Sequence, residues 1–227
     1  MLKRMLCFVM GFVILGISIS ANIYAEDDIS YGDHDLIISA LQDEGFKTDR
    51  LIASRTTKED VPLLADFLMD KNVTRYLDPT LVDGFDSKET AEKFLLNNEM
   101  QYNTTEYCFT IRMKDSFTPI GRVAYTYTSG GMLSINYFLA SEYQGCGYAS
   151  EVILPLTKKI FEASSDVNTF YVSCDYRNNS SYKLAEKICE FIDNRYICKK
   201  SVINGAINGK EINFKCYEFL LVKIVKL

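Results

Sequence analysis

The sequence predicts an α/β fold in which helices cover a mixed sheet. Strand-like stretches with alternating apolar residues follow one another with stretches whose apolar residues recur at helical spacing. Ser129-Gly130-Gly131 joins two of the strand-like stretches and gives the clearest hairpin signal in the chain. A glycine-containing loop at 144–149 links a further strand pattern to a helix pattern. The predicted order is strand, two helices, three strands, helix, strand, helix and two strands.

The first 25 residues have the organisation of a targeting segment. Lys3 and Arg4 precede an apolar stretch (6–19), and the small residue Ala25 follows it. We expect residues 1–25 to be a cleaved signal peptide. An uncleaved signal anchor is the alternative, since the segment approaches the roughly 20 residues that span a bilayer. The basic start favours export of the following domain to the periplasm, the medium or a vacuole, with membrane contact only through an uncleaved segment.

The composition is that of an acidic domain with a buried core. Hydrophobic residues make up 48% of the 227 and charged residues 24%, which is ordinary for a soluble domain. The formal net charge of −5 argues against a nucleic-acid partner, which would call for an excess of Lys and Arg. Six cysteines lie beyond the leader without a C-x-x-C pair, so we expect no metal and favour buried thiols. Disulfides are the alternative, because an exported chain permits them.

Residues 26–49 form a polar N-terminal arm, and the folded domain is expected at 50–227. One apolar patch at 36–41 indicates a short helix or a mobile arm. The lone His34 lies in this arm outside any core pattern, so we do not expect it to be a catalytic base.

The domain should begin with a strand at 51–55. Thr57 is a candidate cap for a helix from Lys58 to about Met69. Ser87 should cap a second helix, with Thr90 where a capping-box Glu would stand. The three strands that follow are expected at 107–113, 120–127 and 132–139.

An amphipathic helix should follow the loop at 144–149, with a kink at Pro155. The remaining elements are a buried strand at 169–174, a helix at about 179–191, and strands near 196–199 and 212–221 that a turn region at Gly205 and Gly209 joins.

The loop at 144–149 has the most specific chemistry. Gly145 and Gly147 allow the backbone to turn and to approach a ligand closely. A helix start leaves backbone N–H groups unpaired and has a partial positive charge. Together these suit a diphosphate without needing Lys or Arg. A strand directly before the loop and a well-patterned helix directly after it set it apart from an ordinary glycine turn.

The stretch 137–151 resembles the acetyl-CoA motif of the GNAT superfamily, which is Q or R, two residues, G, one residue, then G or A. Gln144, Gly147 and Ala149 match it, and the flanking residues resemble the Rim-type branch, which acetylates ribosomal-protein N-termini and other amines. The likeness covers roughly 50–221. It implies a GNAT-like mixed, mostly antiparallel sheet of about six to seven strands flanked by about four helices. Further matching residues are Pro119-Ile120-Gly121, Asn178, Ser181 and Glu186-Lys187.

The resemblance implies direct transfer of an acetyl group from acetyl-CoA to an amine, such as a protein N-terminus or a small amine. Ser181 would lie near the thioester sulfur and support the leaving thiolate, and Asn178 would hold the cofactor arm. Cys146 is not expected to be a nucleophile, because no His accompanies it. The remaining implied cofactor contacts are the backbone of Phe138 and Leu139, where two parallel strands splay apart, and a diphosphate site at Gln144, Gly145, Cys146, Gly147, Tyr148 and Ala149.

Departures from the branch leave the acid and the base open. Ala185 stands where many relatives have a general-acid Tyr, and Ser134 where the branch often has a Glu that can act as base. Asp175, Glu106 or a chain of waters are the substitute bases. One alternative is a catalytically degenerate, exported GNAT-fold module that binds acyl-CoA or a partner. Another is a secreted interaction protein stapled by disulfides.

Overall fold

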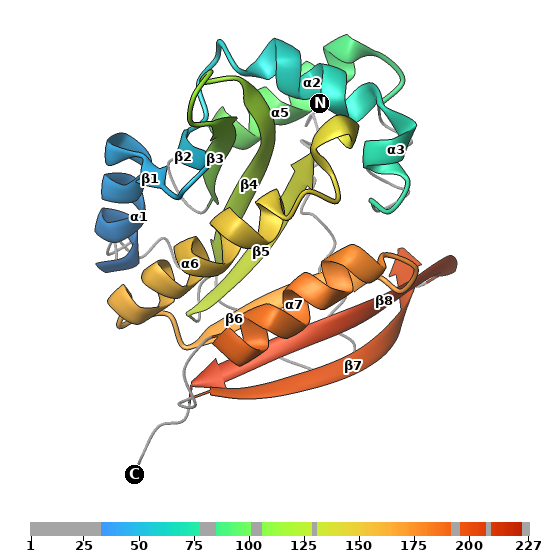
Figure 1. The fold of residues 1–227 in the computed structure, drawn as a ribbon. Coiled ribbons are helices and arrows are strands. Elements are labelled where there is room, and N and C mark those ends of the chain that lie inside the picture. The colour runs from blue at the N-terminus through green and yellow to red at the C-terminus, as the bar shows by residue number, and fades with distance from the viewer. Residues whose placement is uncertain are drawn as a thin grey trace, which may run out of the picture.

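A single mixed sheet organises the chain. The computed structural model describes residues 33–77, 85–100, 106–128, 131–191, 196–207 and 210–223. Within these ranges eight strands pair in the order β1-β2-β3-β4-β5-β6-β8-β7 (Figure 1). The pair β5–β6 is parallel and every other pair is antiparallel. The strands are β1 (Phe46–Lys47), β2 (Leu51–Arg55), β3 (Glu106–Met113), β4 (Pro119–Thr128), β5 (Met132–Leu139), β6 (Thr169–Asp175), β7 (Tyr196–Ile207) and β8 (Lys210–Lys223).

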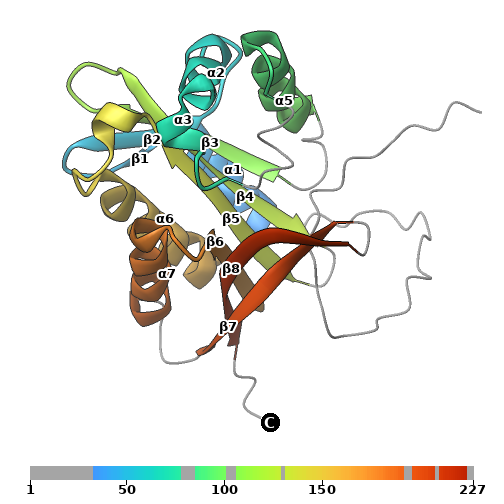
Figure 2. The same cartoon turned by 90° about the vertical axis from the view of Figure 1, so that its right-hand side faces the viewer.

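Helices cover both faces of this sheet (Figures 1 and 2). On one face lie α1, α6 and α7, and on the other lie α2 and α5, with the short α3 following α2. The predicted α/β fold, with a mostly antiparallel sheet flanked by helices, is confirmed. The helices are α1 (Asp33–Glu44), α2 (Val61–Met69), α3 (Lys71–Thr74), α5 (Lys88–Met100), α6 (Tyr148–Ala163) and α7 (Asn179–Phe191), and a 3₁₀ turn, η2, covers Ser141–Tyr143.

Two hydrophobic clusters hold the layers together. The larger one joins the sheet to α1, α6 and α7, and the smaller one joins α2 to α5. The end of β5 reaches both, because successive side chains of a strand point to opposite faces. Leu139 packs in the larger cluster and Phe138 against the smaller one. The tip of β5 is therefore fixed from both sides.

Helix α2 starts three residues later than the sequence predicts, and Thr57 does not cap it. The Thr57 amide instead donates to Asp60 Oδ2 at 3.0 Å. The buried Asp60 carboxylate also accepts a hydrogen bond from Thr110 at 2.8 Å and pairs with Arg112 at 2.5 Å. These long-range contacts hold residues 58–60 in a turn, and the helix begins at Val61.

The predicted cap of the second helix is correct, but the predicted turn at Gly205 is not. The cap of α5 is confirmed, since the Thr90 amide donates to Ser87 Oγ at 3.3 Å and the Ser87 amide to Thr90 Oγ1 at 3.1 Å. Gly205 is not in a turn: it lies inside β7, where the pairing register with β8 shifts, as at a β-bulge. Gly209 and the hairpin residues Ser129 and Gly130 fall outside the ranges given above.

The arm at 26–49 contributes to the core where it is described. Ile38 and Leu41 of α1 are buried in the larger cluster, while Leu36 is exposed. None of the helices in the described ranges is long and apolar enough to cross a bilayer, and the leader lies outside those ranges. Four cysteines are thiols rather than disulfides in the described part: Cys108, Cys146, Cys174 and Cys189.

Candidate active site

The parallel strands β5 and β6 separate halfway along their length. They pair from Met132 with Thr169 to Ser134 with Tyr171, and the pairing ends there. Strand β5 nevertheless continues to Leu139 and β6 to Asp175. The described sheet gives no strand partner to the β6-facing backbone groups of this last part of β5, so a chain-like ligand can hydrogen-bond there.

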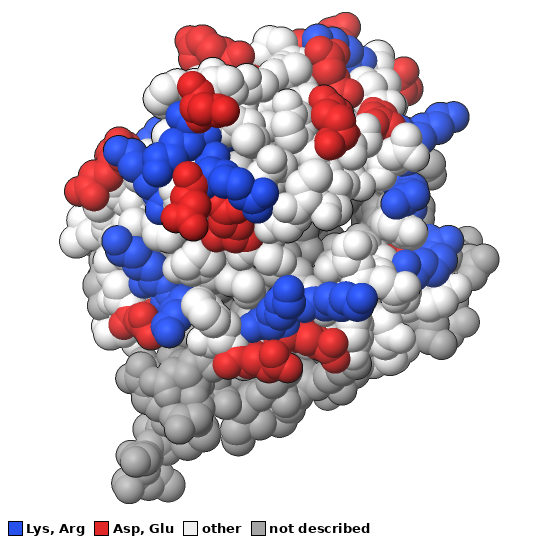
Figure 3. Space-filling view, viewed as in Figure 1, with Lys and Arg blue, Asp and Glu red and all other residues white. Residues whose placement is uncertain are grey.

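A cleft of about 540 Å³ opens at this separation, a volume typical of small-molecule sites. Its walls come from β4, the ends of β5 and β6, the loop after β5, the first turns of α7, and α2, α3 and α5. Figure 3 shows basic side chains over α7 on this face of the molecule, with acidic side chains directly beside them. Among the described lining residues Asp175 is the one acid, and the basic residues are Arg75, Arg122, Arg177, Lys183 and Lys187.

The loop between β5 and α6 requires glycine for its backbone conformation. Gly145 and Gly147 have φ angles of 76° and 81°, in the left-handed region, and Gly147 is the N-cap of α6. A Cβ on Gly145 would meet nothing within 4 Å, and a Cβ on Gly147 would meet only Arg50, at 3.8 Å. Backbone strain, not crowding, therefore explains both glycines.

This conformation presents amide hydrogens to the cleft. The Glu151 amide makes the first bond of the helix, to the Gly147 carbonyl at 3.0 Å. The amides of Tyr148, Ala149 and Ser150 come before that bond in the chain and so have no partner within the helix. All three residues line the cleft. Free N–H groups and the positive end of the helix dipole thus face the same space.

Other loop residues brace the turn. Gln144 Nε2 donates to the Leu139 carbonyl at 3.0 Å and so ties the loop to the end of β5. Cys146 is exposed and, unlike Gln144, Gly145 and Gly147, does not line the cleft. Its carbonyl accepts a hydrogen bond from Arg50 at 3.2 Å, and its thiol donates to the Gln144 carbonyl at 3.6 Å.

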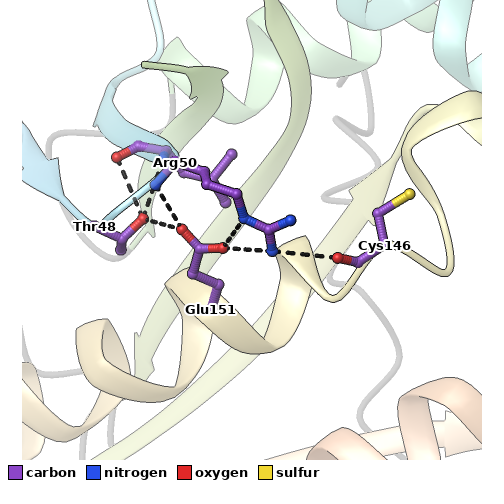
Figure 4. A network of polar contacts seen from close by, with 5 residues as sticks. Thr48, Arg50, Cys146 and Glu151 are labelled. Atoms are coloured by element: carbon purple, nitrogen blue, oxygen red, sulfur yellow. Dashed lines mark hydrogen bonds and ion pairs between the residues drawn. The ribbon is translucent and has the colours of Figure 1, made fainter. Parts of the chain in front are cut away.

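An ionic network that the sequence did not reveal fixes this loop (Figure 4). Glu151 Oε1 accepts from Thr48 Oγ1 at 2.6 Å and from the Arg50 amide at 2.9 Å, and Oε2 accepts from Arg50 Nε at 2.7 Å. The Arg50 guanidinium lies over the Tyr148 ring, 4.4 Å from its centroid. Because Arg50 and Glu151 are 101 residues apart, no local pattern could have indicated this network.

The network predicts a pH-dependent contribution to stability. Burial raises the pKa of Glu151, but the hydrogen bonds from Thr48 and Arg50 outweigh it, so the pKa lies below its ordinary value. A depressed carboxylate pKa stabilises the fold above the unfolded-state pKa, and this contribution is lost as the pH falls through the folded-state pKa. We expect Glu151→Gln to lower the melting temperature by about 2–4 °C at pH 7, and by less as the pH falls below about 4.5.

Thermal unfolding between pH 4 and pH 7 measures this effect. Glu162→Gln is the matched control, because Glu162 lies on the same helix but only pairs with Lys158 at 3.7 Å near the surface. Equal shifts for the two variants, or a Glu151→Gln shift that does not change with pH, would contradict the assigned network.

Asn178 and Ser181 come together at the start of α7, as the resemblance implies. The Ser181 amide donates to Asn178 Oδ1 at 3.1 Å, and both residues line the cleft. Tyr137, which sequence reasoning did not single out, donates from its hydroxyl to Ser181 Oγ at 2.9 Å. Burial raises the pKa of Tyr137 to about 12.

Of the substitute bases, Asp175 is less well placed. Asp175 is buried, accepts from the Arg177 amide at 2.8 Å and pairs with the Arg177 guanidinium at 2.6 Å. Burial raises the pKa of Asp175, but these contacts outweigh it and lower the pKa below its usual value. Its carboxylate is thus weakly basic and already bonded, which favours a structural role. Glu106 starts β3 opposite Thr126, and its side chain lies outside the described part.

Comparisons with known proteins agree with this geometry. A sequence model of the acetyltransferase (GNAT) domain matches residues 50–188. No curated protein sequence matches the chain. A GNAT-family acetyltransferase structure from Bacillus anthracis is 18% identical, with a TM-score of 0.61, and the match covers 78% of this chain and 98% of that chain.

Two ribosomal-protein acetyltransferases are also similar in structure. RimL, a ribosomal L7/L12 α-N-protein acetyltransferase in complex with coenzyme A, is 15% identical with a TM-score of 0.61, over 79% of this chain and 97% of that chain. The ribosomal-protein-S5-alanine acetyltransferase from Vibrio fischeri is 16% identical with a TM-score of 0.61, over 79% of this chain and 96% of that chain. At these identities the likeness establishes the fold.

Proposed function

The chain belongs to the GNAT acetyltransferase family, and from this premise we propose that it transfers an acetyl group from acetyl-CoA directly to a weakly basic amine, a peptide α-amine above all. The single observation that best supports this donor is the loop at 144–149. Its left-handed glycines and unbonded helix amides stand beside strands that separate. A diphosphate joined to a flexible arm fits both features at once.

The diphosphate, the pantetheine arm and the thioester of acetyl-CoA would each have partners in the cleft. The diphosphate would accept hydrogen bonds from the amides of Gly147 to Ser150, the site that a helix start offers an anion. The pantetheine arm would pair with β5 near Phe138 and Leu139, where β6 has moved away. The basic lining of the cleft would neutralise phosphate charge in a chain whose net charge is −5. This arrangement would bring the thioester to Asn178 and Ser181.

Direct transfer is the mechanism that we infer for this site. The amine lone pair attacks the thioester carbon, the C–S bond breaks, and its electron pair leaves on sulfur while the amine proton passes to water. No side chain needs to be acylated. Cys146, the exposed thiol of the loop, lies outside the cleft lining, and Cys174, the thiol in the lining, is buried.

The acceptor preference follows from the cost of deprotonation. At pH 7 an α-amine with a pKa of about 7.7–8.0 costs about 1 kcal/mol to deprotonate, whereas a Lys side chain costs about 4–5 kcal/mol. Ser134 stands where the branch often has a Glu, and it is buried with its hydroxyl 3.4 Å from the Thr126 carbonyl. The one acid among the described lining residues, Asp175, is paired. A site of this kind is suited to an amine that loses its proton readily.

An amine panel tests the proposal. Purified protein is mixed with acetyl-CoA at pH 7 and with equal concentrations of a Lys-free peptide, an Nα-blocked peptide that contains one Lys, or a small amine, and thiol release is followed. We expect the free α-amine to react fastest. Faster reaction of the Lys peptide would overturn the acceptor assignment. Calorimetric binding of acetyl-CoA without turnover on any amine would favour an acyl-CoA-binding module instead.

We further propose that the leader at 1–25 exports the domain or anchors it. Acetyl-CoA is a cytoplasmic metabolite, so an exported enzyme would act inside a host or a vacuole, and an anchored one could meet its donor only on the cytoplasmic side. Fractionation of a C-terminally tagged chain with protease protection distinguishes these cases. A full-length chain in the soluble cytoplasmic fraction would overturn both.

A further inference from the structure

We propose that Tyr137 is a positioning residue that aims the Ser181 hydroxyl hydrogen at the thioester sulfur. The Ser181 hydroxyl would thereby stabilise the leaving group, a role that the Tyr found in many relatives at the position of Ala185 can no longer fill here. The inference rests on the proposed function and adds to it the source of leaving-group stabilisation. Ala185 itself is 1% exposed, packs in the larger cluster and has no polar side-chain atom.

The geometry holds Ser181 from two sides. Tyr137, on β5, donates to Ser181 Oγ at 2.9 Å across 44 residues of sequence. The Ser181 amide is held by Asn178 Oδ1 at 3.1 Å. The Tyr137 ring packs against the larger hydrophobic cluster, which fixes its hydroxyl. All three residues line the cleft beyond the point where β5 and β6 part.

The direction of this hydrogen bond decides what Ser181 can do. A serine hydroxyl has one hydrogen to donate and two lone pairs. The geometry of the contact makes the Tyr137 hydroxyl the donor to Ser181 Oγ. Because burial raises the pKa of Tyr137 to about 12, the phenol keeps at neutral pH the proton that it donates. The Ser181 hydrogen is then not needed for the bond to Tyr137, and the described residues give it no acceptor. It can be donated to a sulfur in the cleft, and the bond from Tyr137 strengthens it as a donor.

Tyr137 does not supply a proton in this scheme. A thiol has a pKa of about 8.5, so proton transfer from a phenol of pKa about 12 would be uphill by about 3.5 pKa units. When the C–S bond breaks, its electron pair goes to sulfur and Ser181 donates a hydrogen bond to the developing thiolate. The proton lost by the amine passes to water. Tyr137 remains neutral throughout and acts only through Ser181.

A double-mutant cycle tests the coupling. Tyr137→Phe removes the hydroxyl and keeps the packed ring. We expect kcat to fall about tenfold, with KM for acetyl-CoA and the melting temperature nearly unchanged. In a Ser181→Ala background the same change should cause no further loss. Tyr125→Phe is the control, because the Tyr125 hydroxyl bonds to Thr157 Oγ1 at 2.8 Å in the core, outside the cleft lining. It should not couple to Ser181.

A second readout does not depend on turnover. The pKa of CoA thiol bound to the full chain can be followed by thiolate absorbance. It should be lower than that of free CoA, should rise in Tyr137→Phe, and should be the same in the double variant as in Ser181→Ala. This inference alone would be overturned if Tyr137→Phe lowered kcat equally with and without the Ser181 hydroxyl. It would also be overturned if the pKa of the bound thiol did not change in Tyr137→Phe. Failure to bind CoA would overturn the proposed function together with it.

Discussion

Replacing Gly147 by alanine is expected to weaken acetyl-CoA binding by about 10- to 100-fold. An alanine at the φ of 81° found there costs about 1–2 kcal/mol, so the turn relaxes and moves the amides that follow it. Losing one or two hydrogen bonds to a charged phosphate, at about 1.5 kcal/mol each, accounts for that factor. Steric exclusion does not contribute, because the new Cβ would have only Arg50 nearby, at 3.8 Å. Isothermal titration measures the change.

Gly45→Ala provides the matched control for backbone strain. Gly45 has a φ of 72°, and a Cβ there would make only ordinary contacts, 3.4 Å to Ile52 and 3.8 Å to Ser54. The residue lies between α1 and β1, and it does not line the cleft. We expect a similar loss of stability and unchanged acetyl-CoA affinity. Equal affinity losses in both variants would show that general destabilisation, not the helix start, governs binding.

Gly121→Ala should damage both the fold and the cleft. A Cβ on Gly121 would lie 2.3 Å from the Phe138 carbonyl oxygen and 2.9 Å from Leu139 Cα, so the end of β5 must move. Overpacking of this kind costs about 1–3 kcal/mol, which corresponds to a loss of about 2–12 °C in melting temperature. The displaced backbone is the part of β5 assigned to the pantetheine arm. We therefore expect kcat/KM for acetyl-CoA to fall more than about tenfold.

Gly131→Ala separates the loss of stability caused by crowding from the loss of catalysis. A Cβ there would lie 2.4 Å from Asn168 Nδ2 and 2.6 Å from the Asp166 carbonyl oxygen, at the opposite end of β5. It should lower the melting temperature without changing kcat/KM at temperatures where the protein is folded. A Gly121→Ala enzyme with normal kinetics would show that the position of the β5 tip does not matter for the donor.

Elements with strong local patterns were predictable from sequence. Strands β3 to β6 and helices α6 and α7 lie within a few residues of their predicted bounds, because alternation and helical spacing are local properties. The capping exchange between Ser87 and Thr90 is equally local. The loop at 144–149 was found for the same reason, since its glycines stand between a strand and a helix in sequence.

What could not be predicted depends on contacts between distant residues. The start of α2 is set by Asp60, whose partners Thr110 and Arg112 lie 50 and 52 residues away. The register shift at Gly205 depends on the pairing of β7 with β8. In the site, the bond from Tyr137 to Ser181 arises only when β5 and α7 are packed together. A sequence pattern indicates which residues line a helix or strand, but not which groups meet across the fold.

The central claim is that the start of α6 binds the diphosphate of acetyl-CoA, and one comparison of affinities tests it most directly. S-Acetylpantetheine has the thioester and the arm of acetyl-CoA but no phosphates. If the helix amides and the basic lining bind the diphosphate, isothermal titration should give acetyl-CoA at least about a 100-fold lower Kd than S-acetylpantetheine, a difference of about 2.7 kcal/mol. Equal Kd values for the two ligands would contradict the claim.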